Sequence, residues 1–202
     1  MSNNDIMLEY LRSSIDHNGI YRCSPGKWLM GKAPNTSYRW QFYLRRCMFT
    51  PQFSITSAEY LIKKLNNPNN IQIAAVESAG VPLGIAMSNI LGVPLLTIKT
   101  ERKKYGLSNW TEGTITGKPI LLVDDLAGSA NSLKNAEYVL NKFNLPVANE
   151  YAVLINKTQG THQINYLEEK TLHSLFTCED FAMSWKAYVD RYNKEPNFGN
   201  WA

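Results

Sequence analysis

Cysteine and histidine are scarce in this sequence of 202 residues. Its three cysteines, Cys23, Cys47 and Cys178, are an odd number and form no CxxC pair. Neither a disulfide framework nor a structural zinc site fits that pattern. The three histidines are scattered and adjoin no candidate nucleophile or metal ligand. We therefore expect reduced thiols in a cytoplasmic protein.

Long apolar runs, internal repeats and low-complexity linkers are also missing. No apolar run approaches the roughly 20 residues that a membrane-spanning helix needs. The opening MSNNDIMLEYLRSSID is too polar for a signal peptide. We expect a soluble protein with no membrane partner.

The excess of positive charge is small, with a formal net charge of +4 and a pI of about 8.9. Such a balance suits an anionic small ligand as well as a weak nucleic-acid surface, so it does not choose between them. With 44% hydrophobic and 19% charged residues, the chain can form one compact domain with a core, or one domain with a small appendage.

The middle of the sequence alternates between strand and helix patterns. Short continuous apolar runs predict strands, and apolar residues at helical spacing predict helices. The expected strands are residues 71–76, 94–99, 119–125 and 149–156, and the expected helices are 54–65, 82–91 and 131–143. Strands that alternate with helices form parallel sheets, and continuously apolar strands are covered on both faces. We therefore predict an α/β fold with a central, mostly parallel sheet flanked by helices.

The two ends of the sequence follow other patterns. Residues 5–16 and 179–195 have apolar side chains at helical spacing and predict one helix each. Between residues 19 and 51, aromatic residues, arginines and turn formers predict short strands and loops, which suit a lid or a dimer surface.

Two adjacent acids, Asp124 and Asp125, follow a buried strand in the stretch ILLVDDLAGSANS. Ligands of open parallel sheets bind at the carboxyl ends of the strands, where these acids fall. The small residues that follow lead into a helix, whose first N–H groups and dipole favour a phosphate. The carboxylates can accept hydrogen bonds from vicinal hydroxyls or hold Mg²⁺ through water. The alternative is structural: the acids end a strand and Ser129 caps a helix.

The same stretch resembles the motif with which type I phosphoribosyltransferases bind 5-phosphoribosyl 1-pyrophosphate (PRPP). The resemblance implies the type I phosphoribosyltransferase fold with a small hood, and Mg²⁺ bound with PRPP. It places Asp124 and Asp125 at the ribose hydroxyls, with any metal held indirectly, and the following loop at the 5-phosphate. The PRPP contacts that it implies in that loop are Leu126, Ala127, Gly128, Ser129, Ala130, Asn131 and Ser132.

The loop departs from the family pattern at its end. The family usually has a Thr soon after the acids and a Gly late in the loop, where this chain has Gly128 followed by Ala130 and Asn131. If Ala130 takes a positive φ, the turn is strained or has a different shape.

Two further stretches resemble the orotate branch of the family. ESAGVPLG stands where a loop of the family contacts the pyrophosphate. The resemblance therefore implies contacts from Glu77, Ser78, Ala79 and Gly80. Many orotate enzymes have a Lys at the position of Ala79. KTERKKYG resembles a charged lid, in which Lys99 aligns with a usual Arg and Lys103 with a Lys that reaches the neighbouring subunit's site. The alternative for the second stretch is a solvated turn.

The base contacts implied by the resemblance come from two other segments. RWQFYLRRCMFTP resembles an aromatic strand near the base, which implies contacts from Trp40, Phe42 and a preceding Lys32. In AVLINKTQG, Lys157 aligns with an Arg that binds the carboxylate of the base, although Lys lacks the bidentate fork of Arg. Core packing is the alternative for Trp40 and Phe42, because residues two apart share one face of a strand.

Together these stretches imply a cytoplasmic pentosyltransferase that is similar to orotate phosphoribosyltransferase. It would transfer the phosphoribosyl group of PRPP to orotate or a related pyrimidine, with Lys103, Asp124 and Asp125 as catalytic residues, and without a nucleic-acid partner. The expected parts are a helix and hood segment (1–50), a PRPP-binding core (51–160) and a C-terminal segment (161–202) that packs on it. Family geometry implies a homodimer with shared sites. The alternatives are another acceptor base, or a PRPP- or nucleotide-binding regulator with weak or absent catalysis.

Overall fold

The computed structural model describes residues 3–24, 27, 29–30, 37–38, 40–99, 109–157 and 170–181. By its contacts the chain divides into two compact units, which are described separately below. One unit is Met48–Thr177, and the other is Met1–Cys47 together with Cys178–Ala202.

A six-stranded sheet forms the centre of the larger unit, with the strand order β10-β9-β8-β5-β6-β7. The strands are β5 (Gln72–Val76), β6 (Leu95–Ile98), β7 (Thr111–Gly113), β8 (Ile120–Ala127), β9 (Val147–Asn156) and β10 (Thr171–Thr177). All neighbouring strands are parallel except β7, which pairs antiparallel with β6.

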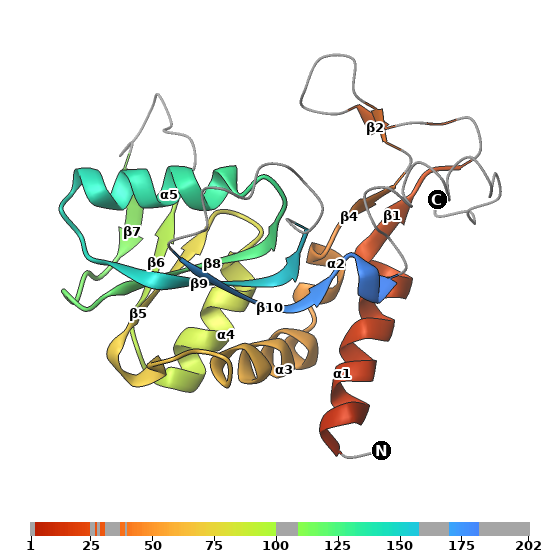
Figure 1. The fold of residues 1–202 in the computed structure, drawn as a ribbon, viewed down its shortest axis with the longest axis horizontal. Coiled ribbons are helices and arrows are strands. Elements are labelled where there is room, and N and C mark those ends of the chain that lie inside the picture. Colours follow the sequence, from red (N-terminus) through yellow and green to blue (C-terminus); the bar gives the residue numbers. More distant parts are fainter. Residues whose placement is uncertain are drawn as a thin grey trace. The chain divides into compact units, whose positions relative to one another are not determined.

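Helices cover both faces of this sheet. Helix α5 (Asn131–Lys142) lies on one face, and α3 (Pro51–Ile62) and α4 (Val81–Leu91) lie on the other (Figure 1). A short 3₁₀ turn, η2 (Pro68–Asn70), leads into β5. This double cover explains why β5 is buried along its whole length. The predicted α/β architecture with a mostly parallel sheet is confirmed.

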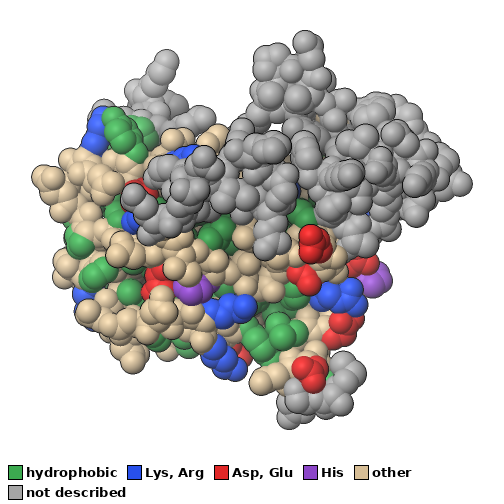
Figure 2. Space-filling view, viewed as in Figure 1, with side chains coloured by type: hydrophobic (Ala, Val, Ile, Leu, Met, Phe, Trp, Pro, Cys, Tyr) green, Lys and Arg blue, Asp and Glu red, His purple; other side chains and the backbone are tan. Residues whose placement is uncertain are grey.

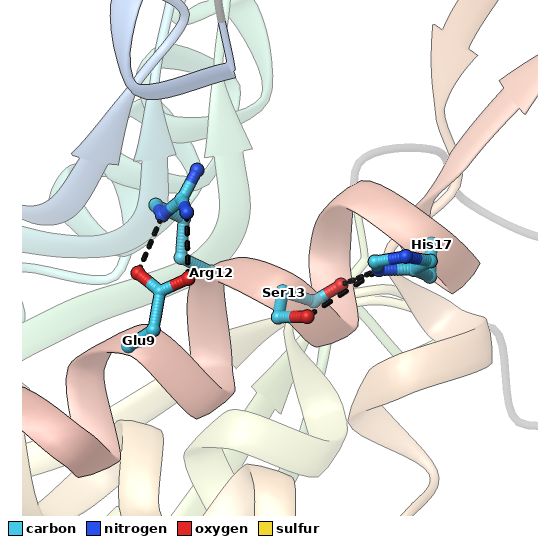
Figure 3. Close-up of polar contacts among 4 residues, drawn as sticks. All are labelled: Glu9, Arg12, Ser13 and His17. Carbon is cyan, nitrogen blue, oxygen red and sulfur yellow. Dashed lines mark hydrogen bonds and ion pairs between the residues drawn. The ribbon is translucent and has the colours of Figure 1, made fainter.

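The smaller unit begins with helix α1 (Asn3–Ser14), which continues into a π-helical turn, η1 (Ile15–Gly19). Figure 3 shows Arg12 donating to both carboxylate oxygens of Glu9, at 2.8 and 2.6 Å, one turn apart on this helix. Within the turn, Nδ1 of His17 lies 2.8 Å from the carbonyl oxygen of Ser13. His17 therefore has a local contact with the helix that precedes it.

Short strands follow in this unit, as the aromatic and turn-forming residues predict. They are β1 (Ile20–Arg22), β2 (Leu29–Met30), β3 (Ser37–Tyr38) and β4 (Trp40–Phe42). The strands pair as two antiparallel ribbons, β1 with β4 and β2 with β3. A one-turn helix, α2 (Arg45–Met48), follows β4, and a 3₁₀ turn, η4 (Glu179–Phe181), begins where the last helix was predicted. The rest of that predicted helix lies outside the described residues.

The surface shows no single dominant charge on the face that Figure 2 presents. Among the coloured residues of that face, Lys and Arg side chains are interspersed with Asp and Glu side chains. In the described parts of the chain, no helix has both the length and the apolar character required to span a bilayer.

Strand β10 was not predicted from the sequence. Buried polar contacts of β10 and of the residue before it stabilise its position in the sheet. On one side Lys170, just before β10, forms a 2.8 Å ion pair with Glu137 of α5, which also accepts a hydrogen bond from the hydroxyl of Tyr151. On β10 itself, His173 lies 2.8 Å from Glu150, which also accepts hydrogen bonds from the backbone and side chain of Asn66. Both carboxylates are buried, so each needs these partners.

The Glu137 contacts lead to a stability prediction. Glu137→Ala leaves the ammonium of Lys170 and the buried hydroxyl of Tyr151 without this acceptor, and we expect it to lower the free energy of unfolding by about 3 kcal/mol. Urea unfolding monitored by tryptophan fluorescence would measure the change. The matched control is Asn135→Ala, an exposed position on the same helix. A loss for Glu137→Ala no larger than that of the control would contradict this prediction.

Candidate active site

The acid pair lies where β8 continues beyond its neighbour β5. The ladder between the two strands runs from Gln72 opposite Ile120 to Ala75 opposite Val123, and β5 ends one residue later. Strand β8 continues through Asp124 and Asp125 to Ala127, paired with β9. The prediction that the strand ends at the acids is therefore corrected by two residues, because the ladder with β9 carries the strand further.

Asp124 is buried and Asp125 is partly exposed. The backbone N–H of Asp125 donates to Oδ1 of Asp124 at 2.8 Å. Burial raises the pKa of Asp124 to about 8, and the neighbouring charge of Asp125 adds to the rise. The two carboxyl groups can thus accept hydrogen bonds from a ligand. Burial and their proximity disfavour a negative charge on both of them at once.

A tight turn connects the acids to helix α5, and it is shorter than the predicted loop. Ala127 still belongs to β8, and α5 begins at Asn131, so only residues 128–130 form the turn. Ala130 precedes the helix with φ 55° and ψ 14°, the left-handed conformation, and its side chain is buried. Such a conformation costs a non-glycine residue roughly 1–2 kcal/mol. The strained turn expected for a positive φ at Ala130 is therefore present, and its methyl group joins the apolar core.

Ala130, and not Ser129, is the N-cap residue of α5, and it makes no side-chain capping hydrogen bond. The first N–H groups of a helix have no acceptor within the helix. Gly128 and Ser129 are at least partly exposed, and a Cβ at Gly128 would meet nothing within 4 Å. The turn therefore offers backbone donors and open space to an anion next to the acid pair.

The loop after β5 packs directly against the acids. A Cβ atom at Gly80 would lie 2.5 Å from the carbonyl oxygen of Val123 and 2.9 Å from Cα of Asp124. Only glycine fits at this position, because both atoms belong to the backbone. The segment from Glu77 to Gly80 is thereby held beside Asp124, and it includes a cis peptide between Glu77 and Ser78.

Two contacts next to this loop were not predicted from the sequence. The hydroxyl of Thr97 on β6 donates to the carboxylate of Glu77 at 2.6 Å. The ammonium of Lys99 forms an ion pair with Glu112 of β7, which raises the pKa of Lys99. The alternation of β6 could have indicated these contacts, because Thr97 and Lys99 share the face opposite to Leu96 and Ile98.

The remaining predicted residues fall in different places. The backbone N–H of Lys157 donates to the carbonyl oxygen of Ala127 at 2.7 Å, which puts Lys157 at the same sheet edge as the acids. Trp40 and Phe42 belong to the smaller unit, where Phe42 is buried against the rings of Trp40 and Phe181, as the packing alternative expects. Lys32 and Lys103 lie outside the described residues.

An apolar groove begins at the Glu77 loop and was not predicted either. It has a volume of about 760 Å³ and is lined by residues of α3 and α4 with Glu77, Ser78, Thr97 and Glu112 at one end. Phe49, Ile55 and Ile85 line it and are 69%, 44% and 46% exposed. Exposed apolar patches of this kind often mark protein contacts.

The acid pair fits a magnesium ion that a substrate carries rather than one that the protein encloses. Among the described residues, no group of three or more His, Cys, Asp or Glu side chains could hold a metal. Mg²⁺ commonly keeps several waters and binds through one or two carboxylates together with substrate phosphates. Asp124 and Asp125 can supply those oxygens, directly or through water.

Comparisons with known proteins agree with this geometry. The family profile described as "Phosphoribosyl transferase domain" matches residues 50–187. An orotate phosphoribosyltransferase of Caenorhabditis elegans is 31% identical over 165 residues, which cover 76% of this chain and 73% of that protein.

Solved structures share the fold at low identity. A phosphoribosyltransferase from Corynebacterium diphtheriae superposes with a TM-score of 0.72 at 15% identity, covering 88% of this chain and 99% of that chain. The Mycobacterium tuberculosis orotate phosphoribosyltransferase in complex with PRPP gives a TM-score of 0.65 at 16% identity, covering 90% and 93%. The extent of the profile match and the identity to the nematode enzyme decide the assignment: the chain belongs to the phosphoribosyl transferase domain family.

Proposed function

We propose that this chain transfers the 5-phosphoribosyl group of PRPP to a nucleobase, with orotate as the acceptor, and releases pyrophosphate. The bond from C1 of the ribose to the pyrophosphate oxygen breaks, and a bond from C1 to a ring nitrogen of the base forms. One observation carries the proposal: the acid pair of β8 lies between the start of α5, whose N-cap residue Ala130 makes no side-chain hydrogen bond, and the Gly80 loop. PRPP has a ribose between its 5-phosphate and its pyrophosphate. The acid pair can bind the ribose hydroxyls, and the two segments beside it can bind the two phosphate groups.

Each part of the substrate then has a partner. Asp124 and Asp125 accept hydrogen bonds from the ribose hydroxyls, and the segment from Ala127 to Ser132 holds the 5-phosphate with backbone N–H groups. The backbone of the Glu77–Gly80 segment approaches the pyrophosphate, where the absence of a side chain at Gly80 allows close contact. These contacts position the substrate, which is the main contribution expected for a transfer that needs no covalent enzyme intermediate.

Departure of pyrophosphate concentrates negative charge that the protein must balance. When bound, Mg²⁺ supplies positive charge at the phosphate oxygens. Lys103 is proposed to add a cation at the same stage, and Lys99 stands at the base of the same segment, beside Glu112. Thr97 orients Glu77 at the edge of this region through its 2.6 Å hydrogen bond.

The proposal of orotate as acceptor rests on the named relatives. The C. elegans protein is an orotate phosphoribosyltransferase, and its similarity covers most of both chains. Lys157 stands at the sheet edge of the acids, where a cation can meet the carboxylate of the base. Base contacts from Lys32, Trp40 and Phe42 remain predictions, as does the cytoplasmic location.

We also propose that the chain forms a homodimer through the apolar groove of α3 and α4. Phe49, Ile55 and Ile85 would bury their exposed apolar surface in such a contact. Because the groove ends at Glu77 and Glu112, a second copy seated there would approach the proposed pyrophosphate site. That placement is compatible with Lys103 acting on the neighbouring subunit.

The function is tested by incubating the protein with PRPP, Mg²⁺ and a panel of bases and measuring pyrophosphate release. We expect release with orotate, and loss of PRPP affinity by about 100-fold or more in Asp124→Asn with Asp125→Asn, because two charge-assisted hydrogen bonds weaken. Asn109→Ala, exposed and distant from the acids in sequence, serves as control. PRPP binding without release for any base would instead support the regulatory module, and unchanged binding in the double variant would contradict the proposed site.

The raised pKa of Asp124 predicts a stability that depends on pH. The unfolded carboxyl group titrates near its usual pKa of about 4, whereas the folded group titrates near 8. The folded state therefore keeps a proton that the unfolded state has released, and this contribution to stability is lost as the pH rises from about 4 to about 8. Asp124→Asn cannot ionise, so its melting temperature should exceed that of the wild type by a few degrees at pH 8.

Thermal unfolding at pH 5, 6.5 and 8 measures this difference. The melting temperature of Asp124→Asn should exceed that of the wild type by a larger amount at higher pH. Asn135→Ala, which changes a group that does not ionise at an exposed position of α5, is the control and should show no such trend. A difference in melting temperature that becomes smaller as the pH rises would show that the fold does not favour the neutral form of Asp124.

The dimer is tested by Ile85→Glu, which places a charge in the groove. We expect the wild type to sediment as a dimer and the variant as a monomer, because an unpaired charge in an apolar interface is costly. Ile115→Glu changes a side chain of similar exposure outside the groove and should stay dimeric. A monomeric wild type at micromolar concentration, or a variant as dimeric as the control, would rule out this surface.

A further inference from the structure

We propose that Glu112 sets how tightly the pyrophosphate group is bound, because its carboxylate holds the ammonium of Lys99 until that group displaces it. The carboxylate and the ammonium form an ion pair in the structure. This role rests on the proposed transfer and deepens it, because Glu112 then takes part in binding and releasing pyrophosphate. Glu112 is a positioning residue in this scheme, since it acts through Lys99 and does not need to touch the substrate.

The pairing of β6 with β7 brings Glu112 to Lys99. Glu112 lies directly opposite Thr97 in the antiparallel register. The backbone N–H of Lys99 donates to the carbonyl oxygen of Trp110 at 2.9 Å, which extends the pairing by one residue beyond β6. Because side chains two apart share one face of a strand, Thr97 and Lys99 point to the same side. Glu112 is therefore opposite one of them and diagonal to the other, within reach of both.

The segment proposed to bind pyrophosphate begins next to this ion pair. The backbone N–H of Glu77 donates to the carbonyl oxygen of Ile98 at 2.8 Å, so Glu77 is attached to the residue that precedes Lys99. The hydroxyl of Thr97 donates to the carboxylate of Glu77 at 2.6 Å. The hydrogen bond from Lys99 to Glu112 raises the pKa of Lys99, and the negative charge of Glu77 adds to the rise. An anion bound at this segment thus lies close to the ammonium.

The charges at this place oppose an anion while Glu112 keeps its position. The carboxylates of Glu77 and Glu112 both lie near the ammonium of Lys99. A ligand with several negative charges gains a favourable contact here only if it takes the ammonium from Glu112. The side chain of Glu112 is 61% exposed, whereas that of Lys99 is 13% exposed. The carboxylate can therefore turn into water at little cost while the ammonium stays at the end of β6.

The exchange affects both the binding and the release of pyrophosphate. When the pyrophosphate group receives Lys99, it gains a cation where negative charge develops as the bond to the ribose breaks. Glu112 competes for the same ammonium, so it weakens the binding of free pyrophosphate. Product release limits the turnover of many enzymes. We therefore expect Glu112 to lower the affinity for pyrophosphate and to speed its departure.

The test is calorimetric titration of pyrophosphate with Mg²⁺ into the full chain and into Glu112→Gln, at an ionic strength of about 0.15 M, where distant charges are screened. We expect the variant to bind pyrophosphate about fivefold more tightly, because the ammonium no longer has to leave an exposed carboxylate. Lys99→Gln should lower the affinity about tenfold, since one charge-assisted hydrogen bond is lost. Glu59→Gln is the matched control: it removes an exposed carboxylate of α3 that does not line the groove, and the affinity should stay within about twofold.

The double variant separates the exchange from a general effect of charge. In the Lys99→Gln background, Glu112→Gln should change the affinity by less than about twofold, because the ammonium for which Glu112 competes is gone. A gain of the same size in both backgrounds, an unchanged or lower affinity in Glu112→Gln, or no binding of pyrophosphate by the wild type would overturn the proposal. Glu112→Ala is the second variant if Glu112→Gln fails to fold, and it should show the same gain.

The binding measurement is independent of the transfer assay. If no base leads to release of pyrophosphate but Glu112→Gln still binds pyrophosphate more tightly, the transferase function fails and the exchange of Lys99 stands. If orotate is converted and Glu112→Gln binds pyrophosphate as the wild type does, only the role of Glu112 fails. In the transfer assay, added pyrophosphate should inhibit Glu112→Gln at a concentration about fivefold lower than for the wild type.

Discussion

The contact between Gly80 and the backbone of β8 is the constraint on which the candidate site depends. A single added methyl group would lie 2.5 Å from the carbonyl oxygen of Val123, so the loop after β5 can take its place only without a side chain. The parallel ladder of β5 and β8 fixes where that loop starts, and the extra length of β8 sets the acids beside it. The sheet thus positions the site before any ligand arrives.

The arrangement has a cost in stability that is concentrated at the acids and the turn. Burial raises the pKa of Asp124, so the carboxylate is disfavoured in the position where a sugar would need it. Ala130 adopts a left-handed conformation immediately before α5. Unfavourable features that gather at one sheet edge, surrounded by a well-packed core, are typical of a functional site.

Much of the core could be predicted from the sequence because its signals are local. Apolar runs such as 73–76 and 120–123 are continuous, because both faces of these strands are buried and no polar residues alternate with the apolar ones. Strands β7 and β10 were missed because β7 is short and polar and β10 alternates weakly. Strand β10 is held by Lys170 and His173, whose partners lie at least 22 residues away along the chain and leave no local pattern.

The sequence by itself determined the alternation of strands and helices from α3 to β9, apart from β7, and it also determined the acid pair and the small residues after it, because each is a property of neighbours along the chain. The tertiary structure decided which residues meet: Gly80 with Asp124, Thr97 with Glu77, and Gln41 rather than Phe42 on the exposed face of β4. The reason is geometric, since a shift of one residue turns a strand side chain to the opposite face, and only pairing with β1 fixes the choice.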